Sequence, residues 1–404
     1  MTGGGPLGRE AVIGVVGAGA MGAGIAQVAA MQGHRVVLAD ASGAAIGRAT
    51  DGHRQAMARE VQRNRLTRAD ADAVLARITA VGSGVGGVGG AELAAFAPCR
   101  FVIEAVVEEL TVKQELFRAL ERVVMPDAIL ATNTSSLSVA AIAGACARPE
   151  RVVGVHFFNP APVMPLVEII PAIATADAVT AAARSLVDTW GKVTVVASDT
   201  PGFIVNRIAR PYYGEALRIL EEGIADCATI DWAMRELGGF RMGPFELMDF
   251  IGNDVNYAVT RSVFEGMFFD PRYRPALTQR RLVESGRLGK KSGRGHYDYR
   301  DGATVPTPAT DAALGRAIVD RIVAMLINEA VDAVQMRVAS PADIEVAMTK
   351  GVNYPRGLLA WGDALGAGAV LATLEALQQE YGEDRYRPSP LLRRIAARGG
   401  RLLA

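Results

Sequence analysis

Three glycines in the segment GAGAMG, residues 17–22, constrain the fold of this chain more than any other feature. Their spacing is GxGxxG; an apolar run, residues 11–16, precedes them, and a helical pattern follows to about Met31. In such a β-turn-α unit the glycines permit a tight turn and a close approach of backbone to a pyrophosphate, while the helix N-terminus supplies N–H groups and partial positive charge. We therefore predict a dinucleotide-binding unit. The predicted cofactor contacts are Gly17, Gly19, Ala20, Met21 and Gly22.

An acidic residue closes the next predicted strand, residues 35–39. Asp40 follows the first glycine of the motif by about 20 residues, where a carboxylate that binds the ribose 2′-hydroxyl is expected. A carboxylate at this position would repel the 2′-phosphate of NADP. The cofactor is therefore expected to be NAD.

Strands and helices alternate along the first 200 residues. The further predicted elements are two helices within residues 42–77, a strand at 100–107, a helix at 111–124 and a strand at 128–132. This alternation indicates an α/β fold in which a doubly wound, Rossmann-like domain covers residues 11–200. Residues 1–10 are expected to be a flexible tail, and the glycine-rich residues 82–90 a loop.

The segment RVVGVHFFNPAPVMPLVEII, residues 151–170, predicts two strands joined by a proline-stiffened turn. That hairpin can place His156 beside Glu168. A neutral imidazole held by a carboxylate is a general base, with one nitrogen oriented and the other turned to a substrate proton. The plain alternative is a core histidine and an unrelated strand-end charge, which is common for a single His and Glu.

Polar residues follow the predicted strand 128–132 directly, in the sequence NTSSL, residues 133–137. Open parallel sheets bind ligands at the carboxyl ends of their strands, so one of the serines in this loop is a candidate to hydrogen-bond a ligand. Serines here could instead cap the next helix, which is expected from Ser138.

From Pro201 onward the pattern is helical, beginning with a long amphipathic helix, residues 200–223, that bends at Pro211. Residues 215–216, 230–231, 233–234 and 243 recur 114 positions later with the same or similar side chains. We expect two copies of one helical domain, residues 201–300 and 311–404, joined by a linker at 301–310. At the same shift Asn206 becomes Asp320, so the second, degenerate copy is interpreted as structural.

Composition excludes several classes of partner. Lys plus Arg and Asp plus Glu both number 43, so neither nucleic acid nor a membrane surface is an expected partner. Cys99, Cys146 and Cys227 form no CxxC or Cys/His cluster, which argues against a disulfide framework and a metal site and favours a cytoplasmic location. Residues 11–33 carry no charge, but their six glycines argue against a membrane span.

Six motifs together resemble the L-3-hydroxyacyl-CoA dehydrogenases. They are GxGxMGxGIA (residues 17–26), NTSSL (133–137), HFFNPxPVMxLVEI (156–169), DTPGFIVNR (199–207), MGPFELxD (242–249) and GKKSGxGxY (289–297). The duplicated end, with GVNYPRGLLAWGD (351–363) and YGEDRYRPS (381–389), is similar to the bacterial type that acts on 3-hydroxyadipyl-CoA or 3-hydroxybutyryl-CoA in phenylacetate or fatty-acid catabolism.

This resemblance implies roles for individual residues. His156 matches the general base and Glu168 its partner, while Ser135 and Asn206 match groups that hydrogen-bond the substrate. Ser135 is also expected to contact the cofactor and the CoA thioester. The implied cofactor contacts are the three glycines with Ala20, Met21 and Asp40, then Glu108, Lys113 and Lys291.

At three positions this chain has a different residue from the one usual in the family. Arg63 stands where the family has a lysine that holds coenzyme A, and Ala56 where it has a serine. Pro165 replaces a basic residue in the turn after the catalytic histidine. We expect these changes to affect binding of the CoA group.

The resemblance implies oxidation of a (3S)-3-hydroxyacyl-CoA to the 3-oxoacyl-CoA with NAD. Two alternatives remain open: a β-hydroxyacid dehydrogenase acting on a free acid, and a non-catalytic NAD-binding relative. The two helical copies are expected to pair within the chain, where single-copy relatives pair between subunits; a homodimer is the other possibility.

Overall fold

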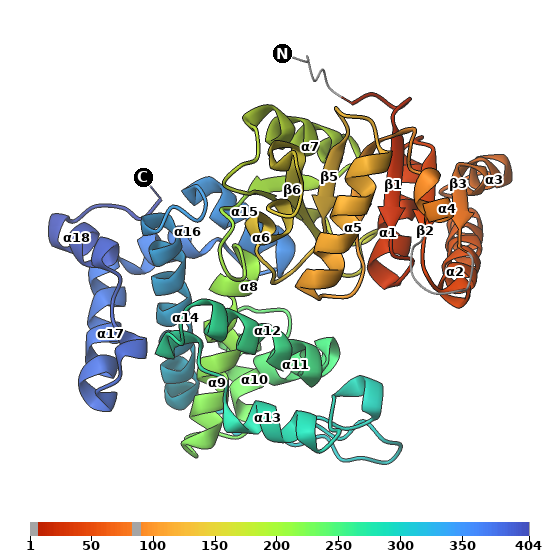
Figure 1. The fold of residues 1–404 in the computed structure, drawn as a ribbon. Coiled ribbons are helices and arrows are strands. Elements are labelled where there is room, and N and C mark those ends of the chain that lie inside the picture. Colours follow the sequence, from red (N-terminus) through yellow and green to blue (C-terminus); the bar gives the residue numbers. More distant parts are fainter. Residues whose placement is uncertain (1–6, 83–89, 404) are drawn as a thin grey trace. The chain divides into compact units, whose positions relative to one another are not determined.

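The computed structural model describes residues 7–82 and 90–403 (Figure 1). The chain divides into two compact units, the first ending at Thr200 and the second beginning at Pro201. Most of the predicted tail, residues 1–6, and most of the glycine-rich loop, residues 83–89, lie outside the described residues.

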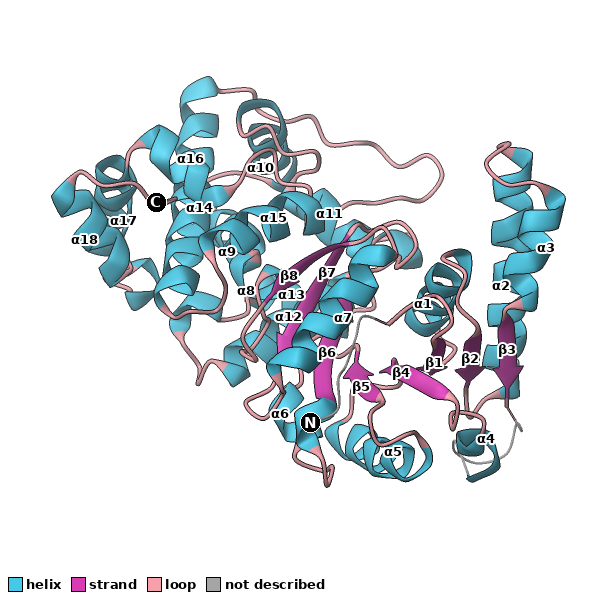
Figure 2. Ribbon diagram, turned by 90° about the horizontal axis from the view of Figure 1, so that it is seen from above, coloured by secondary structure: helices cyan, strands magenta, loops and turns pink. Residues whose placement is uncertain are grey.

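An eight-stranded sheet forms the centre of the first unit (Figure 2). In chain order its strands are β1 (Val12–Val16), β2 (Val36–Ala39), β3 (Ile78–Val81), β4 (Cys99–Glu104), β5 (Ile129–Thr132), β6 (Val152–Phe157), β7 (Leu166–Pro171) and β8 (Val193–Val196). The spatial order is β3-β2-β1-β4-β5-β6-β7-β8, and every neighbouring pair is parallel except β6 with β7. The strand order reverses between β1 and β4, so the carboxyl ends of these strands form the switch point at which such sheets bind ligands.

Helices cover both faces of this sheet (Figure 2). They are α1 (Ala20–Met31), α2 (Gly43–Gln62), α3 (Arg68–Ala76), α4 (Gly90–Ala94), α5 (Leu110–Val123), α6 (Val139–Ala143), the short η1 (Pro149–Arg151) and α7 (Asp177–Thr189). Helices α1 and α7 pack on one face with a continuous apolar core, and α5 and α6 pack on the other. The predicted Rossmann-like α/β fold of this unit is confirmed.

Two strands of the sheet were not predicted. β3 has only four residues, two of them exposed and two half-buried, so it gives neither an apolar run nor a clean alternation. β8 is equally short and begins at an exposed residue. Both strands are held by pairing to a neighbour that is distant in sequence, which a local pattern does not report.

The second unit is helical in its described residues, apart from isolated bridges at Arg294. It contains α8 (Val205–Ile208), α9 (Arg210–Glu221), α10 (Cys227–Trp232), η2 (Ala233–Leu237), α11 (Pro244–Ile251), α12 (Asn253–Gly266), η3 (Pro271–Tyr273), α13 (Leu277–Glu284), η4 (Lys290–Ser292), α14 (Ala312–Gln335), α15 (Pro341–Gly351), α16 (Leu358–Leu365), α17 (Ala367–Tyr381), η5 (Asp384–Tyr386) and α18 (Pro390–Arg398). The long α14 is central, packing against α9, α16, α17 and α18 (Figure 1).

The single long helix predicted over residues 200–223 was wrong at its start. Pro201 and Gly202 lie in a turn, and Phe203 has a positive φ of 47°, so regular helix begins only at Val205. The predicted bend is present as a break at Ala209 between α8 and α9. Pro211 lies in the first turn of α9, where its missing N–H costs no helical hydrogen bond.

The uncharged segment at residues 11–33 forms β1 and α1, and its Ile13 and Ile25 are fully buried in the core. Among the described residues no single helix is long and apolar enough to cross a membrane. The adjacent helices α16 and α17 satisfy that criterion of length and composition only as a pair, and they meet at an angle of 92°.

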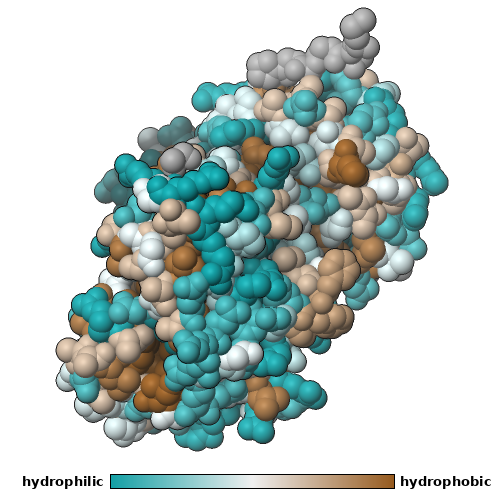
Figure 3. Space-filling model, turned by 90° about the vertical axis from the view of Figure 1, so that its left-hand side faces the viewer, coloured by the Kyte–Doolittle hydropathy of each residue, from teal (hydrophilic) through white to brown (hydrophobic). Residues whose placement is uncertain are grey.

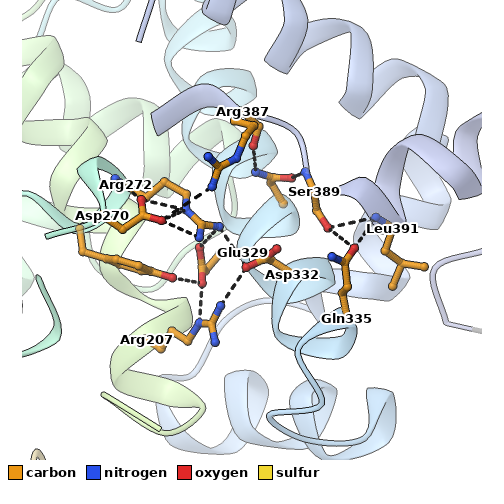
Figure 4. A network of polar contacts seen from close by, with 11 residues as sticks. Arg207, Asp270, Arg272, Glu329, Asp332, Gln335, Arg387, Ser389 and Leu391 are labelled. Atoms are coloured by element: carbon orange, nitrogen blue, oxygen red, sulfur yellow. Dashed lines mark hydrogen bonds and ion pairs between the residues drawn. The ribbon is translucent and has the colours of Figure 1, made fainter. Parts of the chain in front are cut away.

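A buried carboxylate joins distant helices of the second unit (Figure 4). Glu329 on α14 accepts hydrogen bonds from Arg207 Nε at 2.7 Å and from the Tyr273 hydroxyl at 2.5 Å, and Arg272 Nη1 lies 3.5 Å from it. Burial raises the pKa of Glu329, but the charges of Arg207 and Arg272 outweigh it, so the pKa lies below its usual value. Asp332 binds the same two arginines.

A second cluster has the same composition. Glu215 on α9 accepts hydrogen bonds from Arg321 Nε at 3.0 Å and from the Tyr386 hydroxyl at 2.9 Å, and Arg385 Nε lies 3.7 Å away. In each cluster a glutamate is held by arginine and tyrosine side chains from the other half of the unit. The two clusters therefore tie residues 201–300 to residues 311–404.

Replacing Glu329 with Ala should destabilise the second unit by about 1–3 kcal/mol. Asp332 still pairs with both arginines, but Arg207 Nε and the Tyr273 hydroxyl lose their buried acceptor. Urea unfolding measures the loss. The stabilisation by Glu329 should be present above the ordinary glutamate pKa and should fade as the pH falls through the lowered pKa of the folded state.

The exposed pair of Arg280 with Glu284 provides the control for this measurement, since Glu284→Ala should leave the free energy of unfolding nearly unchanged. Equal losses from Glu329→Ala and Glu284→Ala would contradict the assigned role of the cluster.

Candidate functional site

The antiparallel pairing of β6 with β7 sets His156 directly opposite Glu168. His156 Nδ1 lies 2.7 Å from Glu168 Oε2, and both side chains are buried. A carboxylate accepts but does not donate, so Nδ1 carries the proton of the neutral ring and Nε2 is its basic nitrogen. The predicted proximity of the two residues is confirmed.

The loop after β5, residues 133–137, is organised around one carboxylate. Glu108 Oε1 accepts hydrogen bonds from the Thr134 hydroxyl at 2.6 Å and from the backbone N–H groups of Ser135 and Ser136 at 2.9 and 3.1 Å. At the start of this loop, Asn133 Oδ1 accepts a hydrogen bond from the N–H of Phe157. The loop that carries Ser135 is thus fixed to the strand that carries His156.

Glu108 is in turn held by Lys113, whose Nζ lies 3.2 Å from Glu108 Oε2 and 2.5 Å from the buried Glu104. Burial raises the pKa of Glu108, but the charge of Lys113 and the hydrogen bonds from the loop outweigh it and lower the pKa. Lys113 is almost fully buried between these two carboxylates. Both residues predicted as cofactor contacts therefore also position the loop that carries Ser135.

The alternative capping role does not fall to Ser135. Ser138 caps α6 by accepting a hydrogen bond from the N–H of Ala141, and Asp199 accepts from the N–H groups of Val139 and Ala140. The hydroxyl of Ser135 makes one long contact, 3.3 Å to Glu108 Oε1. Its side chain is half-buried, so it is available to a ligand.

The glycine motif fits a pyrophosphate. Gly17 has a φ of +103°, and a side chain there would meet the carbonyl of Ala105 at 2.4 Å, while one at Gly22 would meet the carbonyl of Gly17. A Cβ at Gly19 would have no atom within 4 Å. The first turn of α1 has neither a side-chain cap nor an acidic residue, so its N–H groups face an open space without competition.

Asp40 lies at the end of β2 beside this turn. Its two oxygens accept hydrogen bonds from the N–H groups of Ala18 at 2.6 Å and Ser42 at 2.7 Å. Each carboxylate oxygen can accept a further hydrogen bond, so a ribose hydroxyl can still be bound. The structure thus links the ribose-binding candidate to the glycine turn itself.

The residues expected to hold coenzyme A lie on α2 and at its end. Arg63 is exposed and 3.7 Å from Glu60, so its guanidinium can exchange this weak surface contact for a phosphate. Ala56 is half-buried against the apolar core of the unit. The family serine missing at Ala56 therefore leaves a packed methyl group in its place.

A lysine that the sequence did not single out serves the turn between β6 and β7. Lys192 Nζ donates hydrogen bonds to the carbonyls of Ala161 at 2.5 Å and Met164 at 2.8 Å. Pro165, which replaces a basic residue in this turn, accepts from the N–H of Val193 through its carbonyl. Lys192 thus supplies a positive charge to the turn, although it lies about 30 residues away in sequence.

Two predicted residues lie in the second unit. Asn206 is on α8 with its side chain half-buried, and Lys291 is in η4 with its Nζ 2.6 Å from Asp254 Oδ1. The motif residue Asp249 has a structural task, since it accepts hydrogen bonds from the N–H groups of His296 and Tyr297 and so fastens the segment around Lys291 to α11.

The cysteines are all unpaired, and Cys99 and Cys146 are buried, where desolvation raises the pKa of Cys99 to about 12. In the described part of the chain, no group of three or more His, Cys, Asp or Glu side chains is placed to hold a metal ion.

Comparison with known proteins identifies the family. Residues 12–200 match the family model of the 3-hydroxyacyl-CoA dehydrogenase NAD binding domain, and residues 202–299 and 318–401 match that of the C-terminal domain. The chain is 42% identical to the 3-hydroxyadipyl-CoA dehydrogenase of Escherichia coli, with 95% of this chain and 97% of the relative covered. It is 43% identical to the 3-hydroxybutyryl-CoA dehydrogenase of Bradyrhizobium diazoefficiens, with 73% and 97% covered.

A solved structure agrees with these matches. The crystal structure of 3-hydroxybutyryl-CoA dehydrogenase from E. coli superposes with a TM-score of 0.90 at 40% identity, covering 97% of this chain and 99% of that one. The chain belongs to the 3-hydroxyacyl-CoA dehydrogenase family, and it is an enzyme that oxidises 3-hydroxyacyl-CoA with NAD.

Proposed function

We propose that His156 is the general base of this reaction. Its Nε2 accepts the proton of the 3-hydroxyl group, and Glu168, 2.7 Å from Nδ1, stabilises the positive charge that develops on the ring. Bound NAD would supply the acceptor for a hydride from carbon 3. His156 keeps the hydroxyl proton as the alcohol becomes a ketone. The single observation that carries this proposal is the buried pair of His156 and Glu168.

Two further side chains orient the substrate in this proposal. The Ser135 hydroxyl, on a loop fixed by Glu108, donates a hydrogen bond to the reacting end of the substrate. The Asn206 amide, on α8, provides a second donor. Ser135 also lies next to the cofactor, and Arg63 binds phosphate of coenzyme A. Glu108, Lys113 and Lys291 complete the proposed cofactor contacts.

The finer substrate assignment is either 3-hydroxyadipyl-CoA or 3-hydroxybutyryl-CoA, the compounds named for relatives at 42% and 43% identity. NADH formation at 340 nm with (S)-3-hydroxyacyl-CoA thioesters from butyryl through adipyl to long chains tests the function. Turnover with NAD supports the proposal and supplies the chain length; no turnover with any thioester would refute it.

Replacing His156 with Gln should lower kcat by about 10²- to 10⁴-fold, because the general base is lost while the ring's neighbours remain. NAD affinity, measured by titration calorimetry, should stay nearly constant.

His34 offers a matched control, since it is also buried and its Nδ1 bonds the carbonyl of Ala11, a contact that Gln can reproduce. His34→Gln should leave kcat close to that of the parent enzyme. If NAD affinity collapsed along with kcat in His156→Gln, His156 would be structural and the assignment wrong.

Asp40→Asn should shift cofactor preference toward NADP. The variant keeps one acceptor oxygen but loses the charge that repels a 2′-phosphate, so the ratio of kcat/KM for NAD over NADP should fall about 10-fold or more. Asp51→Asn, an exposed acid on α2 paired with Arg54, should leave the ratio unchanged. An unchanged ratio in Asp40→Asn would remove this residue from the ribose site.

We further propose that residues 201–300 and 311–404 are two copies of one helical domain that pair within the chain, with residues 301–310 as linker. The separate matches of residues 202–299 and 318–401 to one family model support this, as do the two clusters around Glu329 and Glu215. Pairing within the chain would fill the face through which the single-copy domains associate.

Sedimentation velocity tests this pairing. If the Glu329 cluster joins the two helical copies within one chain, Glu329→Ala should leave the number of chains in the assembly unchanged, whatever that number is. An assembly that dissociates on this substitution would instead place the cluster between chains.

A reducing, cytoplasmic compartment remains our proposal, supported by the three unpaired cysteines.

A further inference from the structure

Arg210, in the first turn of α9, is a buried arginine without an acidic partner. It is 7% exposed, and no carboxylate of the described residues lies within ion-pair distance of it. The other buried arginines of this unit, Arg207, Arg321 and Arg385, each pair with a glutamate. A buried cation without a counter-charge is costly, so a partner from outside the chain would explain why this one is present.

The protein contacts of Arg210 leave part of its guanidinium available. Nε donates a hydrogen bond to the carbonyl of Asn206 at 2.7 Å, and Nη1 donates to Thr260 Oγ1 at 3.0 Å. Nη2 donates to no described residue, and it is not among the side-chain atoms that are both fully buried and unpartnered. Nη2 is therefore the part of the guanidinium that remains for an anion.

A second unpaired donor lies in the same aromatic group. The hydroxyl of Tyr354 is buried and has no hydrogen-bond partner among the described residues. The guanidinium of Arg210 lies 4.9 Å from the centre of the Tyr213 ring, and the Tyr212 ring lies 5.7 Å from that of Tyr213 and 5.8 Å from that of Tyr354. A cation that lacks an anion and a buried hydroxyl that lacks an acceptor are together complementary to a carboxylate.

The side chains around Arg210 are polar, whereas the corresponding side chains in the second half of the unit are apolar. Gln279 Nε2 donates to Asn256 Oδ1 at 2.7 Å and to Thr260 Oγ1 at 3.3 Å, and this group is buried around Arg210. The residues that stand 113 or 114 positions later are all buried and apolar: Ala324, Val370, Leu374 and Leu392. The second half of the unit thus makes the corresponding core without polar groups, so those of the first half have another use.

We propose that Arg210, with Tyr354, binds a carboxylate at the far end of the substrate's acyl chain, so that the enzyme prefers 3-hydroxyacyl-CoA thioesters whose acyl chain ends in a carboxylate. This rests on the proposed function, in which Asn206 contacts the reacting end of the substrate. Arg210 Nε donates to the carbonyl of Asn206 at 2.7 Å, so its guanidinium lies beside the residue proposed to contact the reacting end. In a six-carbon diacid the terminal carboxyl carbon is only three bonds of about 1.5 Å from carbon 3, a reach that fits this proximity.

The test compares kcat/KM for (S)-3-hydroxyadipyl-CoA with that for (S)-3-hydroxyhexanoyl-CoA, which has the same chain length but no carboxylate. The parent enzyme should prefer the adipyl thioester. Arg210→Met, which keeps the side chain's length without its charge, should lower the ratio of the two kcat/KM values about 10²-fold. Tyr354→Phe removes only the unpaired hydroxyl and should lower the ratio about 10-fold.

Arg261→Ala is the control, because this exposed arginine neighbours Thr260 on α12, and it should leave the ratio unchanged. A parent enzyme with similar kcat/KM for both thioesters would overturn the proposal, as would a ratio that neither variant changes. Turnover of neither thioester would instead refute the proposed function, so the two failures are distinct. If Arg210→Met did not fold, the parent ratio and Tyr354→Phe would still decide.

Discussion

The antiparallel pairing of β6 with β7 is the contact on which the proposed chemistry of this enzyme depends. All other neighbouring strands of the sheet are parallel, and this exception turns the chain back so that residues twelve apart face each other. The side-chain period of a strand is two, so a slip of one residue would move His156 or Glu168 to the opposite face. The flanking residues Val155 and Ile169 are fully buried, and this burial fixes the register. The proposed catalytic pair is therefore a consequence of core packing.

Three sets of buried charges among the described residues have different uses. Glu108 and Lys113 hold a loop, while Glu215 and Glu329 join the two halves of the helical unit. In these groups each charge meets an opposite charge, so the cost of burial is offset. Arg210 is different because its neighbours are neutral. In our proposal the unpaired charge of Arg210 binds the carboxylate of the substrate, whereas the paired charges stabilise the folded structure.

Local features of the sequence were sufficient for much of the fold and of the candidate site. The glycine turn, Asp40 and the hairpin around His156 all lie in short segments whose patterns are set by neighbouring residues. Lys192 was missed because it bonds backbone carbonyls about 30 residues earlier, and carbonyls carry no sequence signature. The surroundings of Arg210 are spread over residues 210–354. One signal was available, because the alignment that pairs Asn206 with Asp320 also pairs Arg210 with Ala324.

A crystal structure of the enzyme with NAD and a 3-oxoacyl-CoA thioester tests the central claim most directly. The account predicts that His156 Nε2 lies about 2.6–3.2 Å from the oxygen on carbon 3, with Nδ1 still bonded to Glu168. A substrate oxygen held by other groups, with Nε2 bonded to the protein and turned from carbon 3, would contradict it.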